Sequence, residues 1–147
     1  MGNEPAMETG MNDANPGASE GRQPHVMYVE DNRANALLVE RALAAHANVT
    51  LSVIPNAEEA LTRIASQAPD LMLLDLHLPG MSGEDLLVRL RREPRFATLP
   101  VVIITADAAT STSDRLLAHG ATMHMTKPID IRMLVDVVRK FTQRGPQ

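Results

Sequence analysis

The chain contains no cysteine and no tryptophan among its 147 residues. The absence of cysteine excludes disulfides, thiolate metal sites and cysteine nucleophiles, and it fits a cytoplasmic protein. Aromatic residues make up only 2% of the chain. Methionine and aliphatic side chains must therefore fill the core.

Long hydrophobic runs and an excess of positive charge are also missing. No apolar run approaches the roughly 20 residues that a membrane helix needs. The N-terminus has no basic region followed by an apolar core, as a signal peptide would. The formal net charge is −4. We therefore expect no membrane insertion, and no nucleic-acid binding by this domain.

The composition that remains is typical of one soluble domain, with 44% hydrophobic and 22% charged residues. Residues 1–23 are rich in Gly, Asn, Glu, Ala and Pro and show no apolar periodicity, which predicts a disordered leader. The folded domain is expected at residues 24–143, followed by a short tail at 144–147.

Apolar patterning predicts strands alternating with helices. The strands are expected at residues 25–29, 49–54, 71–74, 100–104 and 123–126, and the helices at 32–45, 56–65, 82–93, 110–119 and 130–141. In the first helix the apolar residues at helical spacing are Ala34, Leu37, Leu38, Ala42 and Ala45. Expected N-caps are Asn56, Ser82 and Asp130, and Gly120 is the expected end of the fourth helix.

The links between these elements are too short for anything but βαβ crossovers. We therefore predict an α/β fold with a single doubly wound, five-stranded parallel sheet and helices on both faces. The common strand order for five such units is 2-1-3-4-5, as in flavodoxin-like folds, with a crevice between strands one and three.

The residues around Asp75 carry the first functional signal. Four apolar residues lead into Asp75, and turn-forming residues follow within a few positions. Because a charge inside a strand is costly, Asp75 is expected at the carboxyl end of its strand, facing the crevice. An isolated aspartate after a strand is equally typical of a turn, so this residue alone does not decide.

Polar residues follow other strands at the same edge: Glu30 and Asp31 after the first, Thr105 after the fourth, and Lys127 after the fifth. Three carboxylates repel one another and need a cation. Few oxygen ligands suit Mg²⁺ (or Mn²⁺), which keeps waters and accepts phosphate oxygens. Lys127 adds a positive charge and Thr105 a hydroxyl. This set predicts attack by Asp75 on phosphorus to form an aspartyl phosphate.

Four motifs, in this order, make the chain resemble a receiver domain of two-component response regulators over residues 26–141: VMYVEDN, LMLLDLHLPGMSG, VVIITAD and GATMHMTKPID. The resemblance implies that Asp75 is the phosphoacceptor. It also implies that Asp31 and Asp75 bind Mg²⁺ with the backbone carbonyl of His77, while Glu30 acts through a metal-bound water.

The resemblance further implies that Thr105 and Lys127 contact the phosphoryl group and that the Lys127–Pro128 bond is cis. His124 occupies a position where the family usually has Tyr or Phe. That aromatic couples phosphorylation to the surface formed by the helix at 110–119, the strand at 123–126 and the helix at 130–141. Because histidine is polar and titrates near neutral pH, we expect altered or weaker switching here.

His77 and Asp107 stand at positions that tune dephosphorylation in the family. The implied partners are a histidine kinase or a histidine phosphotransfer protein, with a possible homodimer through the surface just defined. A receiver catalyses its own phosphorylation and dephosphorylation and is not otherwise an enzyme. The run VMYVEDNRANALLVERAL is similar to receivers of hybrid sensor histidine kinases, so a stand-alone receiver and a piece of a larger regulator or kinase both remain open.

Three other functions fit the sequence less well. A haloacid-dehalogenase-like phosphatase needs a second aspartate two residues after the first and an inserted cap, whereas this chain has His77 there and no such insertion. A P-loop nucleotide binder needs a Gly-rich loop with Lys-Ser/Thr, which is absent. A scaffold receiver that is not phosphorylated would have lost one of the key residues, and all are present.

Overall fold

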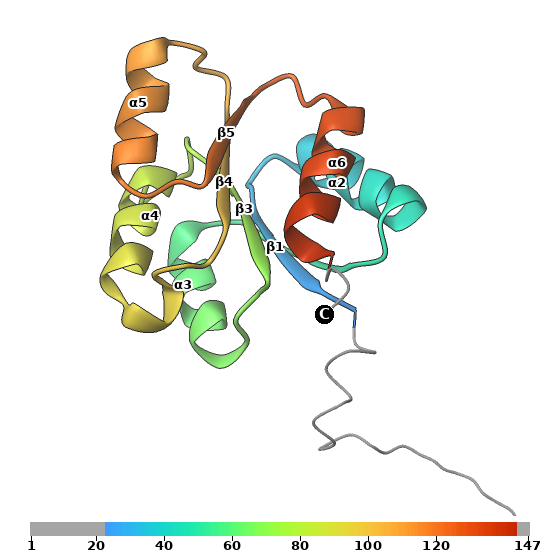
Figure 1. The fold of residues 1–147 in the computed structure, drawn as a ribbon, viewed down its shortest axis with the longest axis horizontal. Coiled ribbons are helices and arrows are strands. Elements are labelled where there is room, and N and C mark those ends of the chain that lie inside the picture. Colours follow the sequence, from blue (N-terminus) through green and yellow to red (C-terminus); the bar gives the residue numbers. More distant parts are fainter. Residues whose placement is uncertain (1–22, 144–147) are drawn as a thin grey trace, which may run out of the picture.

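One parallel sheet with the strand order β2-β1-β3-β4-β5 forms the centre of the molecule (Figure 1). The computed structural model describes residues 23–143. Its strands are β1 (His25–Val29), β2 (Thr50–Ile54), β3 (Leu71–Asp75), β4 (Val101–Thr105) and β5 (Met123–Thr126). The predicted sheet and strand order are confirmed. The predicted leader, apart from Gln23, and the predicted tail lie outside the described residues.

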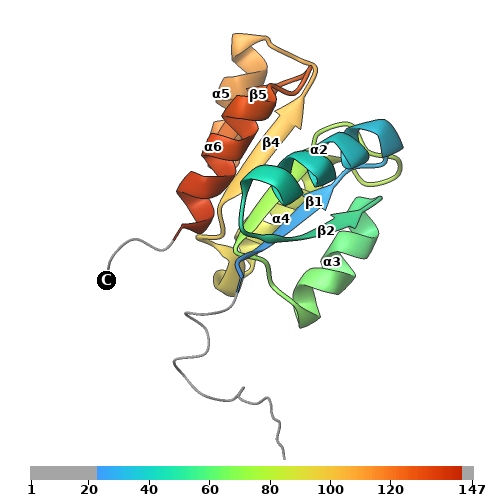
Figure 2. The same ribbon diagram turned by 90° about the vertical axis from the view of Figure 1, so that its right-hand side faces the viewer.

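Helices cover both faces of the sheet (Figures 1 and 2). One face carries α2 (Arg33–His46) and α6 (Ile131–Thr142), and the other carries α3 (Ala57–Ser66), α4 (Gly83–Arg92) and α5 (Thr110–Ala118). A short 3-10 helix, η2 (Pro94–Phe96), follows α4 and was not predicted. Within residues 23–143, no helix has both the length and the apolar character needed to cross a membrane.

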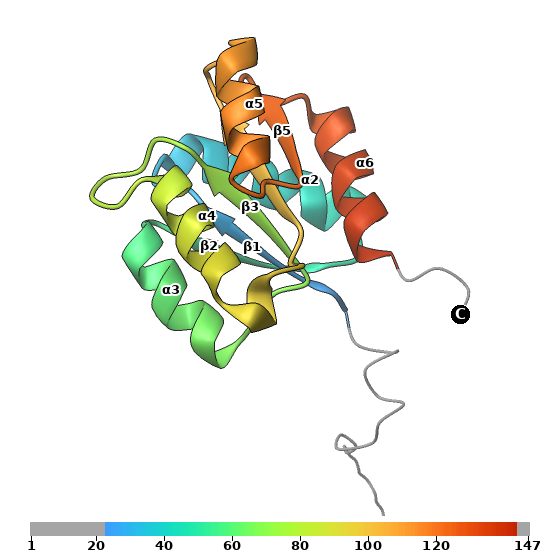
Figure 3. The ribbon, with the colours of Figure 1, turned by 60° about the vertical axis from the view of Figure 1, so that its left-hand side comes forward.

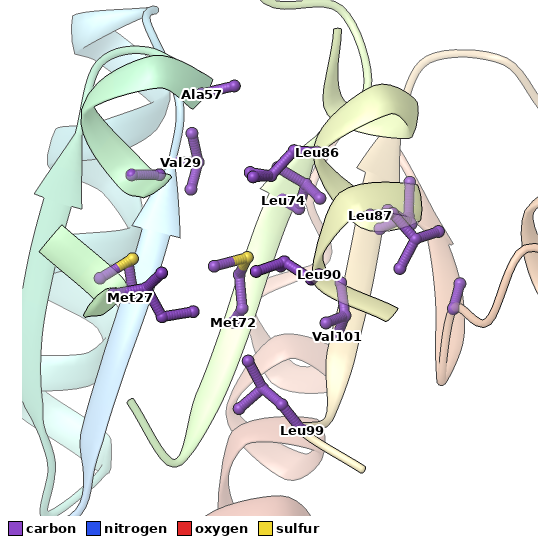
Figure 4. Close-up of a cluster of buried hydrophobic side chains, with 14 of the residues drawn as sticks. Met27, Val29, Ala57, Met72, Leu74, Leu86, Leu87, Leu90, Leu99 and Val101 are labelled. Atoms are coloured by element: carbon purple, nitrogen blue, oxygen red, sulfur yellow. The ribbon is translucent and has the colours of Figure 1, made fainter. Parts of the chain in front are cut away.

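Each face of the sheet has its own apolar core, because successive strand residues point to opposite sides. On the α3–α4–α5 face, Met27, Val29 and Met72 pack with Leu86 and Leu90 of α4 (Figure 4). The other core holds the alternate residues of the same strands under α2 and α6, including Val26, Tyr28, Leu71 and Leu73. Methionines in the first core occupy space that aromatic side chains would otherwise fill.

Side-chain caps fix where α3, α4 and α6 begin, as they do for α2, which Asn32 caps. Asn56, Ser82 and Asp130 each accept a hydrogen bond from the backbone N–H three residues on, which satisfies a donor that the helix itself leaves free. Gly120 follows α5 with φ of 105°, a conformation that residues with a side chain rarely adopt. These four sequence-based assignments are confirmed.

The helix α2 forms as expected, but most of the apolar residues that indicated it lie outside the core. Leu37 and Leu38 are 46% and 43% exposed, whereas the buried residues of α2 are Val39, Ala42 and Leu43. Only Ala42 belongs both to the predicted apolar stripe and to the buried residues of α2. Both sets have helical spacing, so periodicity alone does not select the face that packs on the sheet.

Candidate functional site

The carboxyl ends of β1, β3 and β4 bring three acids and a threonine to one edge of the sheet. Figure 3 shows the loop between β3 and α4 extending beyond this edge. Glu30 and Asp31 follow β1, Asp75 ends β3 and Thr105 ends β4. The carboxylates of Glu30, Asp31 and Asp75 offer oxygen atoms that all lie within 4.8 Å of one another. Residues that are far apart in the sequence therefore form one acidic cluster.

Two of these acids are buried and share a single cation. Glu30 is 2% exposed and Asp75 3% exposed, whereas Asp31 faces solvent. The Lys127 Nζ atom lies 3.2 Å from Glu30 Oε1 and 3.3 Å from Asp75 Oδ1. One ammonium group thus contacts both buried carboxylates. Because the cluster contains three carboxylates, it keeps an excess of negative charge.

The balance of charge changes the acidity of Asp75. Burial raises the pKa of its carboxyl above the ordinary value, and the neighbouring Glu30 carboxylate raises it further. Lys127 and the His77 N–H, which donates to Asp75 Oδ1 at 3.3 Å, oppose the increase in pKa. A second cation near Asp75 would therefore stabilise its ionised form.

The close start of α4 holds the backbone of Asp75 in place. A Cβ atom on Gly83 would overlap the carbonyl oxygen of Asp75, so only glycine allows α4 to begin this near to the end of β3. The Gly83 N–H donates to the carbonyl of Leu76 at 2.9 Å. The loop between them is tied to α3, because the Glu58 carboxylate accepts from the Met81 N–H at 2.9 Å.

Thr105 and Lys127 lie side by side across β4 and β5. Thr105 is fully buried, and its carbonyl accepts from the Lys127 N–H at 2.7 Å. Its side-chain hydroxyl accepts from the Asp107 N–H at 3.2 Å. The Lys127–Pro128 peptide bond is cis. The strand pairing therefore brings the hydroxyl and the ammonium to the same edge as the acids.

His124 contacts the loop that follows Thr105. Its Nε2 atom lies 3.3 Å from the carbonyl oxygen of Asp107. The Asp107 side chain accepts from the Ala109 N–H at 2.9 Å and from the Thr112 hydroxyl at 2.7 Å, and these bonds lower the pKa of that carboxyl. Asp107 thus connects Thr105, His124 and the first turn of α5.

Sequence reasoning missed one member of the site, Tyr28. Its hydroxyl donates to Glu30 Oε1 at 2.8 Å, and burial together with the Glu30 carboxylate raises the pKa of Tyr28, which stays protonated. The available signal was the spacing, because residues i and i+2 of a strand lie on the same face. A tyrosine two residues before a buried acid was therefore a candidate partner.

A groove opens beside the acidic cluster, between α2 and the end of β2. It has a volume of about 500 Å³ and is lined by Glu30, Asp31, Arg33, Leu37 and Pro55, among others. The exposed Leu37 gives this groove an apolar wall next to the carboxylates. Its mixed lining suits a partner that presents both apolar and charged groups.

A buried carboxylate, a shared lysine and an acidic cluster thus lie together at the edge of a doubly wound sheet, and comparison with known proteins identifies the family of the domain. The family model for the response regulator receiver domain matches residues 26–139. The chain therefore belongs to the response regulator receiver domain family. This membership favours the receiver over the phosphatase and P-loop alternatives.

Curated relatives contain this domain within longer chains. The chain is 36% identical over 134 residues to the sensor histidine kinase GacS of Pseudomonas protegens, covering 86% of this chain and 14% of the kinase. It is 35% identical over 122 residues to the phosphate regulon regulator PhoB of Rhizobium meliloti, covering 83% of this chain and 53% of PhoB. The chain thus spans about one-seventh of the first relative and half of the second.

Solved structures share the fold. A response regulator from Chloroflexus aurantiacus matches with a TM-score of 0.78 and 28% identity, covering 84% of this chain and all of that one. The receiver domain of the sensor histidine kinase PA1611 from Pseudomonas aeruginosa, which has a magnesium ion coordinated in its active-site cleft, matches with a TM-score of 0.75 and 20% identity. It covers 84% of this chain and 100% of that one.

Proposed function

We propose that this domain is a phosphoacceptor switch of a two-component phosphorelay, with Asp75 as the residue that is phosphorylated. The observation that carries the proposal is the position of Asp75. It is a nearly buried carboxylate at a strand end, within reach of Lys127 and beside two further acids. Such an arrangement presents a nucleophile together with groups that stabilise negative charge.

The acidic cluster fits a divalent cation such as Mg²⁺ or Mn²⁺. Three carboxylates meet within 4.8 Å and only one ammonium group offsets the two buried ones, so a cation would relieve their repulsion. Asp31, Asp75 and the His77 carbonyl would hold it, with Glu30 acting through a bound water. When bound, the metal supplies charge neutralisation at the transferring phosphoryl group.

The reaction is a transfer of a phosphoryl group between side chains. An Asp75 carboxylate oxygen attacks the phosphorus of a phosphohistidine, the N–P bond breaks, and the imidazole leaves with the electron pair. The Lys127 ammonium contacts the phosphoryl oxygens. The Thr105 hydroxyl, whose oxygen accepts from the Asp107 N–H, keeps its own proton to donate to the phosphoryl group. His77 and Asp107 flank the approach of the water that later hydrolyses the product.

Phosphorylation would be transmitted through Asp107 to the surface formed by α5, β5 and α6, here called the α5–β5–α6 surface. The Asp107 N–H donates to Thr105 and its carbonyl contacts His124, so one residue links the phosphoryl contact to the switch position. His124 replaces the usual aromatic, and we infer that this substitution alters or weakens the response of the α5–β5–α6 surface.

A histidine kinase or a histidine phosphotransfer protein is the proposed donor. The groove beside α2 supports this, because it places an apolar wall next to Glu30 and Asp31, the two acids that cluster with Asp75. The domain would catalyse only its own phosphorylation and dephosphorylation, and it could also dimerise through the α5–β5–α6 surface. The similarity to GacS and to PhoB is compatible with a place in a hybrid kinase or in a regulator.

Incubation with acetyl phosphate and Mg²⁺, followed by intact-mass measurement, tests the function. We expect addition of one phosphoryl group, and its loss with a chelator or with Asp75→Asn. Asp136→Asn, which removes an aspartate from the exposed side of α6, is the matched control and should still be phosphorylated. Absence of an adduct on the parent protein at saturating acetyl phosphate would contradict the proposal.

A further inference from the structure

Tyr28 places a hydroxyl inside an otherwise hydrocarbon environment. The side chain is fully buried, and the buried residues clustered with it on the α2–α6 face of the sheet are aliphatic or methionine. A hydroxyl in such surroundings is costly unless it has a hydrogen-bond partner. Its partner is Glu30, which lies two residues further along the chain and on the same side of the sheet.

The hydrogen bonds of Glu30 divide between its two oxygens. The Oε1 atom receives the Tyr28 hydroxyl at 2.8 Å and the Lys127 ammonium at 3.2 Å, with the Asn35 amide at the limit of 3.5 Å. The Oε2 atom receives the Asn32 N–H at 3.2 Å. The shortest of these contacts is the one with Tyr28, which is also a neutral donor.

We propose that Tyr28 is a positioning residue for Glu30 in the metal-dependent reaction, an inference that rests on the proposed function. The hydroxyl orients Glu30 toward the acidic cluster without adding positive charge, so the attraction of the cluster for a cation is preserved. It also satisfies Oε1, which leaves Lys127 shared between Glu30 and Asp75. Without the hydroxyl, Lys127 is the main donor to Oε1 and is drawn away from Asp75.

Filling of the core does not require the hydroxyl. Phenylalanine has almost the same shape and would suit the apolar neighbours of Tyr28 better than tyrosine does. The substitution Tyr28→Phe therefore removes the bond to Glu30 and leaves the packing in place. This makes the variant a direct test of positioning.

Calorimetric titration with Mg²⁺ alone gives the first readout. We expect Tyr28→Phe to weaken Mg²⁺ binding by about 10-fold, which is typical when a group that orients a metal ligand is removed. The matched control is Thr142→Val, because Thr142 is also buried and its hydroxyl donates to the Val138 carbonyl, away from the site. Thr142→Val should bind Mg²⁺ as the parent does.

A double-mutant cycle separates positioning from a general change in the fold. In a Glu30→Ala background, Tyr28→Phe should leave Mg²⁺ affinity unchanged, because the carboxylate through which Tyr28 acts is gone. An equal loss of affinity in both backgrounds would overturn the proposal. So would unchanged Mg²⁺ affinity in Tyr28→Phe alone.

Tyr28 is the single tyrosine of a chain without tryptophan, so tyrosine emission comes from this side chain and responds to changes around its hydroxyl. We expect a saturable change in tyrosine emission as Mg²⁺ is added to the parent protein. No emission change, in a protein that calorimetry shows to bind Mg²⁺, would contradict the link from Tyr28 to the metal. A parent protein that binds no Mg²⁺ at all would instead contradict the proposed function.

Discussion

At the scale of single residues, the buried position of Asp75 affects the stability of the fold. Burial and the Glu30 carboxylate raise its pKa, so the folded protein binds a proton at Asp75 more tightly than the unfolded chain does. The stability that this proton supplies is present below the ordinary aspartate pKa and is lost as pH rises through the raised value. At neutral pH, without metal, the ionised Asp75 is destabilising.

Asp75→Asn should therefore stabilise the metal-free protein at pH 7, because it removes the repulsion between Asp75 and Glu30 while Lys127 keeps its contact with Glu30. The measurement is chemical denaturation of parent and variant across pH, with chelator present. The gain should shrink as pH falls through the raised pKa of Asp75, since the parent is then protonated. Added Mg²⁺ should stabilise the parent more than the variant. A variant less stable than the parent at pH 7 would contradict this account.

The position of an acid that follows a strand is easier to predict from the sequence than the hydrogen bonds that the acid makes. Glu30, Asp31 and Asp75 could be assigned to one edge because parallel strands end together, and the structure brings their carboxylates together. The bond from Tyr28 depends on which face of β1 each side chain occupies and on the distance between them. Strand periodicity predicts the face that each side chain occupies, but it does not predict the distance between the two side chains.

At the scale of elements, the position of α4 relative to β3 depends on Gly83. Helix propensity alone predicts that Gly83→Ala adds about 0.5–1 kcal/mol of stability. The new Cβ atom, however, would overlap the backbone carbonyl of Asp75, which cannot move as a flexible side chain can. Overpacking of this kind costs about 1–3 kcal/mol, so it outweighs the gain in propensity.

We therefore expect Gly83→Ala to lower the free energy of unfolding and to slow phosphorylation by acetyl phosphate, since α4 or Asp75 must shift. Denaturation and intact-mass time courses measure the two effects. Asp85→Ala is the control, because it places an alanine at an exposed position of the same helix. A Gly83→Ala protein with raised stability and an unchanged rate would show that the close approach is unimportant.

Predictability also differs between elements. Polar caps at Asn56, Ser82 and Asp130 give helix starts directly, because the capping bond is local. The buried face of α2 was less predictable, since Leu37 and Leu38 match helical spacing as well as Val39 and Leu43 do. The sequence does not predict η2, because a proline such as Pro94 is typical both of the end of one helix and of the first turn of the next.

At the scale of the whole molecule, the proposed switch requires a path from Asp75 to the α5–β5–α6 surface. The structure offers one candidate path: the Asp107 N–H donates to the Thr105 hydroxyl, and the Asp107 carbonyl contacts His124. The side chain of Asp107 also binds Ala109 and Thr112 at the start of α5. In the proposed switch, a movement of Thr105 toward a phosphoryl group on Asp75 would break the bond from the Asp107 N–H to the Thr105 hydroxyl.

The residue at position 124 should then determine how strongly α5 and β5 respond to phosphorylation of Asp75. His124 is held to the Asp107 carbonyl by a polar contact of 3.3 Å, and a polar ring has less to gain from moving into an apolar space than an aromatic hydrocarbon ring does. With beryllofluoride and Mg²⁺ as a phosphate mimic, hydrogen exchange in α5 and β5 should change more in His124→Tyr than in the parent. Asp75→Asn, which removes the proposed acceptor, is the control and should show no mimic-dependent change in hydrogen exchange. An identical response in the parent and in His124→Tyr would exclude a switching role for position 124.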